Sequence, residues 1–288
     1  MNLSQPGCLA DLTSKGYVVI RDFLPAAELE SFKQDAQRPL GAGRKNENYD
    51  VVPISQQMLD RFEPLAAGIS NAARRDAAID TDLTVGGGYF STGRGISFPW
   101  HQDHESFFLY QDHSHYLNLY IPLVKPDSNK SGVCLIPFDQ LLARWPAAAQ
   151  QFVGGGASRF VPTGDSTTVL NDETDQESTL PFNVESIAVT PQISARDLLL
   201  FRGDMIHRTQ DTSTERLAVS IRRQRSGSVV DRRRLLGGGR TKWHIVRNNA
   251  FEYESLLQCF TESQCDSLTV GHLIRKLRDR AAARHAQG

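Results

Sequence analysis

The spacing of hydrophobic positions divides the chain into three parts, of which the first, residues 1–80, is predicted to be a helical layer. Residues 7–37 predict a helix, a strand and a second helix, with the run Y-V-V-I at 17–20 as the strand. Apolar side chains recur at helical spacing over 55–76, and the polar, glycine-rich segment 40–50 is expected to be a loop. Helices therefore come first along the chain.

The second part, residues 81–224, changes to short apolar runs separated by turn residues. The runs include L-T-V-G-G-G-Y-F, H-Y-L-N-L-Y-I-P-L, D-L-L-L-F and R-L-A-V-S-I-R. Many short strands punctuated by glycine and proline are typical of an antiparallel sandwich or barrel. The acidic segment 164–179 contains no lysine or arginine and is expected to be a long loop between strands. Loops of this length in a compact domain are often functional lids.

The third part, residues 225–288, is expected to add helices to the outside of this core. Helical patterning returns over 250–284. It follows a basic segment, residues 222–247, in which nine lysines and arginines stand against one acidic residue. The C-terminal helices offer a surface for oligomerisation. We interpret the three parts as a single domain, although 288 residues would also suffice for two small domains.

The composition is that of an ordinary soluble globular protein. Hydrophobic residues make up 40% of the chain and charged residues 23%, and the net charge is −1, which argues against a disordered or wholly nucleic-acid-binding chain. The N-terminus lacks the pattern of a signal peptide, and no apolar run approaches the roughly 20 residues needed to span a bilayer. The four scattered cysteines fit neither a CxxC metal site nor a disulfide framework. We therefore expect a soluble, cytoplasmic protein.

Candidate chemistry is concentrated in the segments F-P-W-H-Q-D-H at 98–104 and M-I-H-R at 205–208. His101 and Asp103 are two residues apart, so on an extended strand their side chains leave the same face and can bind one ion together. His207 would complete a two-histidine, one-carboxylate site, which favours non-haem iron(II) and leaves positions open for a co-substrate and O2. In the alternative interpretation, His207 caps a strand and Asp103 binds a loop amide.

Three further histidines compete for the metal. His104 would point to the opposite face of an extended segment, whereas His113 and His115 lie in a Q-D-H-S-H turn where exposure to solvent is expected. They rank behind His101 and His207 as ligands. Because they neighbour the site, they remain candidates for binding substrate, and we include His104 among the substrate residues.

The open side of such a metal needs an anionic chelator, and a 2-oxoacid is bound most firmly when a guanidinium pairs with its distal carboxylate. Arg216 begins the strand R-L-A-V-S-I-R nine positions after His207, so a strand returning past the metal would bring this side chain under the site. By parity, Ser220 and Arg222 share the face of Arg216, and Ser220 is a candidate helper. The alternative for Arg216 is a solvated charge at a strand end.

Two polar side chains of the strand H-Y-L-N-L-Y-I-P-L are further candidates for binding the co-substrate. Asn118 and Tyr120 alternate with Leu117 and Leu119. If the leucines face an outer helical layer, Asn118 and Tyr120 line the cavity and can hydrogen-bond the co-substrate or substrate; if not, they are exposed. The sequence leaves both arrangements open.

Tyr89, Arg94 and Arg202 are weaker candidates for the substrate pocket. The basic segment suggests an anionic small molecule, either carboxylated or phosphorylated, or a carrier-bound acyl group, although a solvated face is the simpler explanation. No aromatic stacking platform is interleaved with these arginines, which argues against nucleic acid as a partner.

Taken together, these motifs resemble the phytanoyl-CoA dioxygenase family of iron(II)- and 2-oxoglutarate-dependent oxygenases. The resemblance spans roughly residues 10–222 and rests on four segments in order: G-Y-V-V-I-R-D-F-L-P-A-A-E-L, H-Q-D, Y-I-P-L-V-K-P-D-S-N-K-S-G-V-C-L-I-P-F and D-L-L-L-F-R-G-D-M-I-H-R-T. It implies a mainly β fold, a double-stranded β-helix (jelly roll, cupin-like), with N-terminal and C-terminal helices packed outside. The implied cofactors are iron(II), the co-substrate 2-oxoglutarate and O2.

The family pattern assigns the iron ligands to His101, Asp103 and His207 and the 2-oxoglutarate-binding arginine to Arg216. Two features depart from it. The chain has I-P-F-D-Q where the family often continues into glycine, serine and histidine, and Arg216 lies slightly closer to His207 than is usual. Because Asp103 is present, the site resembles that of the hydroxylating members. Halogenating members have a small residue at this position, which leaves room for chloride.

The resemblance implies that oxidative decarboxylation of 2-oxoglutarate to succinate is coupled to oxidation of a substrate. We expect hydroxylation of an unactivated C–H bond in a small, anionic or amino-acid-like metabolite. Desaturation or oxidative cyclisation in natural-product biosynthesis would need the same residues. A hypothesis of another class is a non-catalytic metal-binding jelly-roll sensor or binding protein. A zinc hydrolase is disfavoured, because no obvious base lies near the motif.

Overall fold

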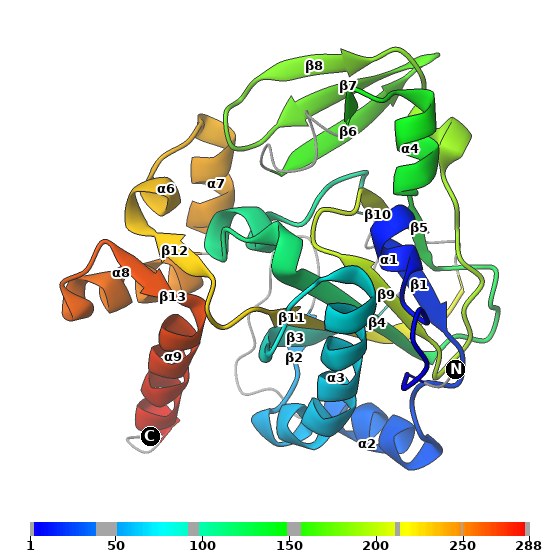
Figure 1. The fold of residues 1–288 in the computed structure, drawn as a ribbon. Helices are drawn as coiled ribbons and strands as arrows, with labels where there is room; N and C mark the ends of the chain where they lie inside the picture. Colours follow the sequence, from blue (N-terminus) through cyan, green and yellow to red (C-terminus); the bar gives the residue numbers. More distant parts are fainter. Residues whose placement is uncertain are drawn as a thin grey trace.

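The computed structural model of the protein describes residues 3–38, 51–91, 98–148, 157–210, 214–248 and 250–285. The loop expected over 40–50 and the candidate substrate residue Arg94 lie outside these ranges. Figure 1 shows a β core with helices on its outside, the N-terminal ones on one side and the C-terminal ones on another. None of the helices within these ranges combines the length and apolar character that a membrane crossing requires.

The larger sheet has six strands in the spatial order β1, β9, β4, β11, β3, β2, and all neighbours are antiparallel. The strands are β1 (Tyr17–Ile20), β2 (Val51–Pro53), β3 (Leu83–Ser91), β4 (Tyr116–Val124), β9 (Leu198–Arg202) and β11 (Leu217–Gln224). The strand predicted at 17–20 is therefore confirmed as β1. The N-terminal part of the chain thus adds both edge strands to this sheet as well as helices.

A second group of strands faces the first sheet. Its members are β5 (Val133–Leu135), β6 (Ser158–Thr163), β7 (Ser166–Asn171), β8 (Glu177–Leu180) and β10 (His207–Thr209). β5 pairs with β10, β6 to β8 form a three-stranded ladder, and His101 joins the two by bridging His207 on one side and Arg159 on the other. Buried side chains from both layers, such as Leu199 and Leu135, pack between them. This arrangement is the expected double-stranded β-helix.

The loop expected over 164–179 is instead a hairpin formed by β7, a turn and β8, so that prediction was wrong. Thr167 and Val169 are buried, because alternate residues of β7 point inward. Asn171 closes the turn by accepting the backbone N–H of Glu173 at 2.9 Å. Charge and length suggested a loop, but the β-branched alternation in S-T-T-V-L-N favours a strand.

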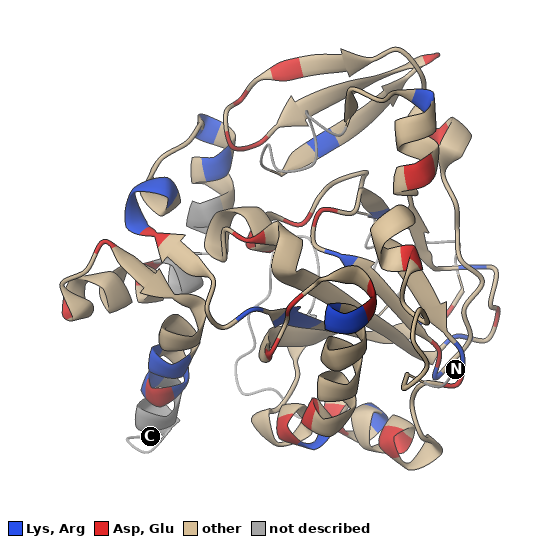
Figure 2. Cartoon of the chain, viewed as in Figure 1, with Lys and Arg blue, Asp and Glu red and all other residues tan. Residues whose placement is uncertain are grey.

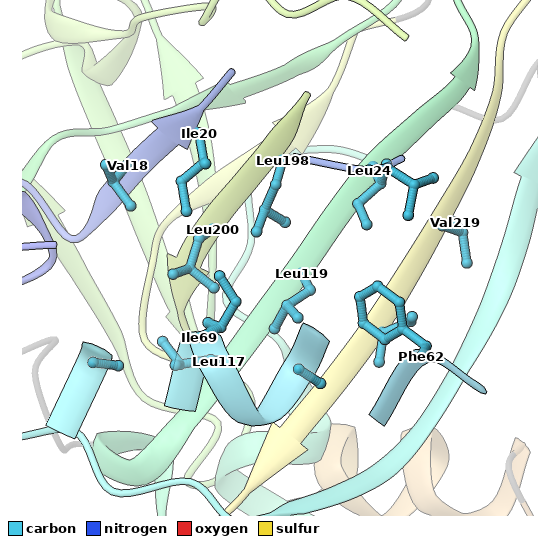
Figure 3. Close-up of a cluster of buried hydrophobic side chains, with 14 of the residues drawn as sticks. Val18, Ile20, Leu24, Phe62, Ile69, Leu117, Leu119, Leu198, Leu200 and Val219 are labelled. Atoms are coloured by element: carbon cyan, nitrogen blue, oxygen red, sulfur yellow. The ribbon is translucent and has the colours of Figure 1, made fainter. Parts of the chain in front are cut away.

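The N-terminal helices cover the outer face of the larger sheet. They are α1 (Asp11–Ser14), α2 (Ala26–Ala36) and α3 (Gln56–Ala77). Leu117 and Leu119 of β4 belong to the same buried cluster as Phe62 of α3 (Figure 3). Since side chains alternate along a strand, Asn118 and Tyr120 lie on the inner face, between the two layers of strands.

The remaining elements surround the core. A π-helix spans Glu105–Leu109, 3-10 turns span His113–His115 and Val184–Ile187, and α4 spans Phe138–Arg144. The C-terminal elements are β12 (Val229–Asp231), α6 (Arg232–Leu236), α7 (Arg240–Asn248), α8 (Ala250–Ser263), β13 (Ser267–Thr269) and α9 (Val270–His285). Phe260 of α8 and Leu273 of α9 pack in one cluster with Leu109 of the π-helix and Leu83 of β3. The C-terminal part is therefore packed against the core.

The basic segment 222–247 does not form one continuous basic surface. Its Lys and Arg residues are visible on α6 and α7 in Figure 2, but Arg223 lies in β11 with its side chain 1% exposed. The Nη1 of Arg223 pairs with Glu63 of α3 at 2.9 Å, and the Nζ of Lys242 pairs with Glu173 at 3.1 Å. Part of this charge is therefore neutralised inside the fold.

Candidate metal centre

His101 and His207 are brought together by direct backbone pairing. The N–H of His101 donates to the carbonyl of His207 at 2.9 Å, and the N–H of His207 donates to the carbonyl of His101 at 3.0 Å. Residues that exchange both hydrogen bonds in an antiparallel pair stand directly opposite and project to the same face. The ring centroids are 4.4 Å apart. The pairing of two distant segments therefore places both imidazoles at one point.

The neighbours of His101 anchor its segment and point away from the centre. Trp100 is buried on the side of the second group of strands that faces away from the larger sheet, and its indole N–H donates to Glu185 at 2.8 Å. Gln102 is also buried, and its amide donates to the carbonyl of Asp204 at 2.9 Å. The strand alternation then leaves His101 and Asp103 on the opposite side, as the spacing predicts.

Asp103 completes a cluster of three potential ligands. Its Oδ1 lies 3.7 Å from the Nε2 of His101 and 3.6 Å from the Nε2 of His207. The ligand atoms of the three residues all lie within 4.8 Å of one another. Within the described part of the chain, this is the only group of three histidine, cysteine or acidic residues gathered in this way. Two imidazoles and one carboxylate on one side suit iron(II) with open coordination positions.

Hydrogen bonds from the backbone and from Asn118 orient all three side chains. The Nδ1 of His101 donates to the carbonyl of Pro99 at 2.7 Å, and the Nδ1 of His207 donates to that of Met205 at 3.0 Å. Because a carbonyl only accepts, each Nε2 is left without a proton and can bind a metal. Asn118 donates to the Oδ2 of Asp103 at 2.8 Å, which leaves Oδ1 toward the histidines. The residues therefore fit an iron ion.

Electrostatics keep His207 neutral and Asp103 ionised. Burial, together with the neighbouring His101, lowers the pKa of His207 to about 4, so this imidazole is neutral at physiological pH. Burial would raise the pKa of Asp103, but His207, His101 and Arg222 outweigh it and hold the pKa well below the usual range. For His101, burial is outweighed by Asp103, which raises the pKa. Asp103 is thus a carboxylate over the physiological range.

Arg216 lies directly before β11 and its side chain is buried. Its Nη1 is 3.4 Å from the carbonyls of Ser131 and Gly132. Tyr120 is close by: burial raises the pKa of its hydroxyl, and the Arg216 charge opposes that rise. Ser220 stands opposite Tyr120 in the register of β11 and β4. The structure therefore groups the three candidate co-substrate residues Arg216, Tyr120 and Ser220, while Asn118 contacts the candidate ligand Asp103.

Two of the candidate substrate residues are engaged elsewhere. Tyr89 stands opposite Val219 on the outer face of the sheet, and its hydroxyl donates to Asp35 of α2 at 2.7 Å. It therefore faces the helical layer and not the metal. Arg202 donates to both carboxylate oxygens of Asp204, at 3.0 and 2.7 Å. The sequence could not assign the face of Tyr89, because the run G-G-G-Y-F has no polar alternation.

The three remaining histidines also have other contacts. The Nε2 of His104 is 2.9 Å from Asp172, and its ring stacks on Phe108 with 5.2 Å between centroids. His113 stacks on an aromatic ring of the π-helix, and His115 accepts a backbone N–H at 3.0 Å. None of the three belongs to the metal cluster. His104 follows Asp103 directly and stays near the centre.

Arg222 is a further charged residue at the site. The sequence indicated only that it shares a strand face with Arg216, because the two are an even number of positions apart. It stands opposite Asn118 in the register of β11 and β4, and its Nη2 is 3.9 Å from the Oε1 of Glu105. Its charge contributes to the low pKa of Asp103. The parity with Arg216 placed it on the inner face, but only the register shows that it lies beside the ligands.

Comparison with known proteins gives a consistent result. The chain matches a family model described as phytanoyl-CoA dioxygenase (PhyH) over residues 12–220. Among solved structures it is similar to the non-haem alpha-ketoglutarate-dependent epimerase SnoN from nogalamycin biosynthesis, with a TM-score of 0.51, 17% identity and coverage of 76% of this chain and 82% of that chain. None of the curated proteins compared with the chain matches it.

Two further solved structures have the same level of similarity. The alpha-ketoglutarate-dependent carbocyclase SnoK from nogalamycin biosynthesis has a TM-score of 0.51 and 14% identity, covering 83% of this chain and 89% of that chain. EctD from S. alaskensis has a TM-score of 0.51 and 13% identity, covering 82% of this chain and 87% of that chain. At these identities the likeness concerns the fold.

Proposed function

Because the chain belongs to the phytanoyl-CoA dioxygenase (PhyH) family of iron(II)- and 2-oxoglutarate-dependent oxygenases, we propose that it hydroxylates an unactivated C–H bond of a small, anionic or amino-acid-like metabolite. Succinate and carbon dioxide are the co-products of this reaction. The observation that carries the proposal is the cluster of His101, Asp103 and His207, in which both Nε2 atoms face one carboxylate oxygen. We also propose a cytoplasmic location, in keeping with its four free cysteines.

Bound iron would supply activation of O2, with 2-oxoglutarate as the source of two electrons. The protein's own residues have three tasks in this reaction. His101, Asp103 and His207 hold the ion from one side, and Asn118 keeps one oxygen of Asp103 from turning away. Arg216, buried near Tyr120, would pair with the distal carboxylate of 2-oxoglutarate. The covering layers exclude water and orient the target carbon.

Hydroxylation is the outcome we favour among those that this set of residues serves. Desaturation and oxidative cyclisation would use the same ligands, and the similar structures include an epimerase and a carbocyclase whose identity to this chain is below 20%. Such likeness does not choose between reactions. The carboxylate of Asp103 occupies the position where the family's halogenating members have a small residue, which supports hydroxylation over halogenation.

Replacement of His207 tests the proposal. We expect His207→Ala to abolish iron-dependent release of succinate from 2-oxoglutarate and to weaken iron(II) binding under anaerobic conditions, with the fold kept. His244→Ala, on the exposed side of α7, is the matched control and should behave as the wild type. A wild-type protein that binds iron but never turns over 2-oxoglutarate under O2, and whose His207→Ala variant loses only thermal stability, would instead be a structural metal protein.

A further inference from the structure

The inner face of the larger sheet continues beyond the metal ligands to Arg222. In the register of the three central strands, Arg222 of β11 stands opposite Asn118 of β4 and opposite Gly86 of β3. Residues directly opposite in antiparallel strands project to the same face. Asn118 is the residue that holds Asp103, so Arg222 occupies the next position along the sheet from the metal centre.

Polar groups around Arg222 lack hydrogen-bond partners. Its Nη2 is 3.9 Å from the Oε1 of Glu105, which is too long for a hydrogen bond. Among the described residues, the Nε of Arg222, the Oδ1 of Asn118 and the hydroxyl of Tyr116 are buried side-chain atoms without a partner. Tyr116 and Asn118 are 0% and 1% exposed. Buried polar groups are normally satisfied, so a cluster of three indicates a site for a polar ligand.

The described residues leave space beside Arg222. A Cβ atom added at Gly86 would meet none of their atoms within 4 Å. At the neighbouring Gly87, on the opposite face, it would meet Ile54 at 2.5 Å and the carbonyl of Ser220 at 2.7 Å. The outer face is therefore packed, whereas the inner face at Gly86 leaves room. The Arg222 side chain is 20% exposed, so a ligand can reach it.

Arg216 and Arg222 are too far apart to serve one small dianion. They are six positions apart in the sequence, which corresponds to roughly 20 Å along an extended strand. Arg216 lies at the Tyr120 end of the inner face, and Arg222 lies at the Asn118 and Glu105 end. 2-Oxoglutarate spans far less than that distance. The two guanidinium groups therefore suit two different anions.

On the basis of the proposed function, we infer that Arg222 binds a carboxylate of the metabolite that is to be hydroxylated. The chain of this substrate then lies over Gly86 and extends toward the metal centre. A planar guanidinium pairs with a carboxylate through two parallel hydrogen bonds. In the free protein Glu105 is the acidic residue within 4.0 Å of Arg222 in the described part of the chain, and its side chain is 38% exposed, so it can turn to solvent when the substrate carboxylate arrives. Arg222 thereby selects an anionic substrate and fixes the distance of its carboxylate from the metal centre.

The test uses the full chain loaded with Mn(II) and saturating 2-oxoglutarate, so that no turnover occurs and the co-substrate site is filled. Hexanoate is the probe and hexanamide its neutral counterpart, and calorimetry measures both affinities. We expect the wild type to bind hexanoate at least tenfold more tightly than hexanamide. Arg222→Gln should lower the hexanoate affinity about 10- to 100-fold, the range for hydrogen bonds between charged groups. Arg225→Gln, which removes a charge paired with Asp112, is the matched control.

Gly86→Val supplies a second, independent arm, because it keeps every charge and fills the open space. We expect it to fold normally and bind Mn(II) and 2-oxoglutarate as the wild type does, but to lose hexanoate binding. Equal binding of hexanoate and hexanamide, or hexanoate binding unchanged in both variants, overturns the inference. So does an equal loss of 2-oxoglutarate affinity in Arg222→Gln. A wild type that binds neither Mn(II) nor 2-oxoglutarate contradicts the proposed function itself.

Discussion

At the scale of single residues, hydrogen bonds determine which atom of each side chain is available to bind a metal. The backbone carbonyls of Pro99 and Met205 accept the Nδ1 protons of His101 and His207, which leaves both Nε2 atoms for a metal. These acceptors are main-chain groups, so a substitution at Pro99 or Met205 that keeps the backbone would keep them. The candidate metal centre therefore depends on backbone geometry as much as on the three residues proposed as ligands.

Arg216 is the residue on which the co-substrate assignment depends. We expect Arg216→Gln to weaken 2-oxoglutarate binding about 10- to 100-fold, because a charge-assisted pair with the distal carboxylate is lost. Iron(II) affinity should stay the same, since Arg216 lies at the Tyr120 end of the inner face. Anaerobic titration of the iron-loaded protein with 2-oxoglutarate measures the effect, with Arg225→Gln as control. Unchanged affinity would place the distal carboxylate on another residue.

At the scale of elements, β4 separates structure from chemistry by its two faces. Leu117 and Leu119 pack against α3, while Asn118 and Tyr120 face the second layer of strands. The same alternation operates in β11, where Val219 faces the helices and Ser220 stands opposite Tyr120. A register slip of one residue would exchange the two faces, so the packing against α3 also holds the site in place.

Leu119→Ala tests this packing. Leu119 is 0% exposed between the sheet and the helical layer, so truncation should lower the free energy of unfolding by about 2–5 kcal/mol. Leu142 of α4 is 37% exposed, and Leu142→Ala should change the free energy of unfolding by no more than about 0.5 kcal/mol. Urea unfolding of the two variants and the wild type gives the comparison. Similar losses in both would mean that Leu119 does not fill a packed core.

At the scale of the whole molecule, an ion pair ties the helical layer to the sheet. Arg223 of β11 is 1% exposed, and its Nη1 is 2.9 Å from the carboxylate of Glu63 on α3. Its Nε also donates to Ser70 of α3 at 2.8 Å. Arg223 thus points to the helices, and its neighbour Arg222 points to the metal centre. Adjacent residues of one basic run serve opposite faces of the same sheet.

Glu63→Gln should show what this tie contributes. The buried Arg223 would lose its counter-charge, so we expect the free energy of unfolding to fall by about 1–3 kcal/mol. Asp60→Asn removes a carboxylate from the same helix that contacts only the exposed Gln56 among the described hydrogen bonds, and should have little effect. Thermal unfolding at low and at moderate salt measures both variants. A loss as large in Asp60→Asn as in Glu63→Gln would point to the overall charge of α3 instead.

Local periodicity alone determined much of this protein. The strand at 17–20, the helix over 55–76 and the common face of His101 and Asp103 all follow from spacing within a few residues. The resemblance of four segments, in order, to the family's motifs predicted the double-stranded β-helix. These features are readable in sequence because they depend on neighbours along the chain.

Tertiary structure decided the features that depend on distant segments. The backbone pairing of His101 with His207, the outward face of Tyr89 and the position of Arg222 beside Asn118 each required knowing which strands are neighbours. The alternation in S-T-T-V-L-N marks β7 locally, but its pairing with β8 depends on the cluster in which Val169 and Leu180 are buried. Strand order and register are set by burial across the whole molecule, so the local pattern of one strand does not identify the strand with which it pairs.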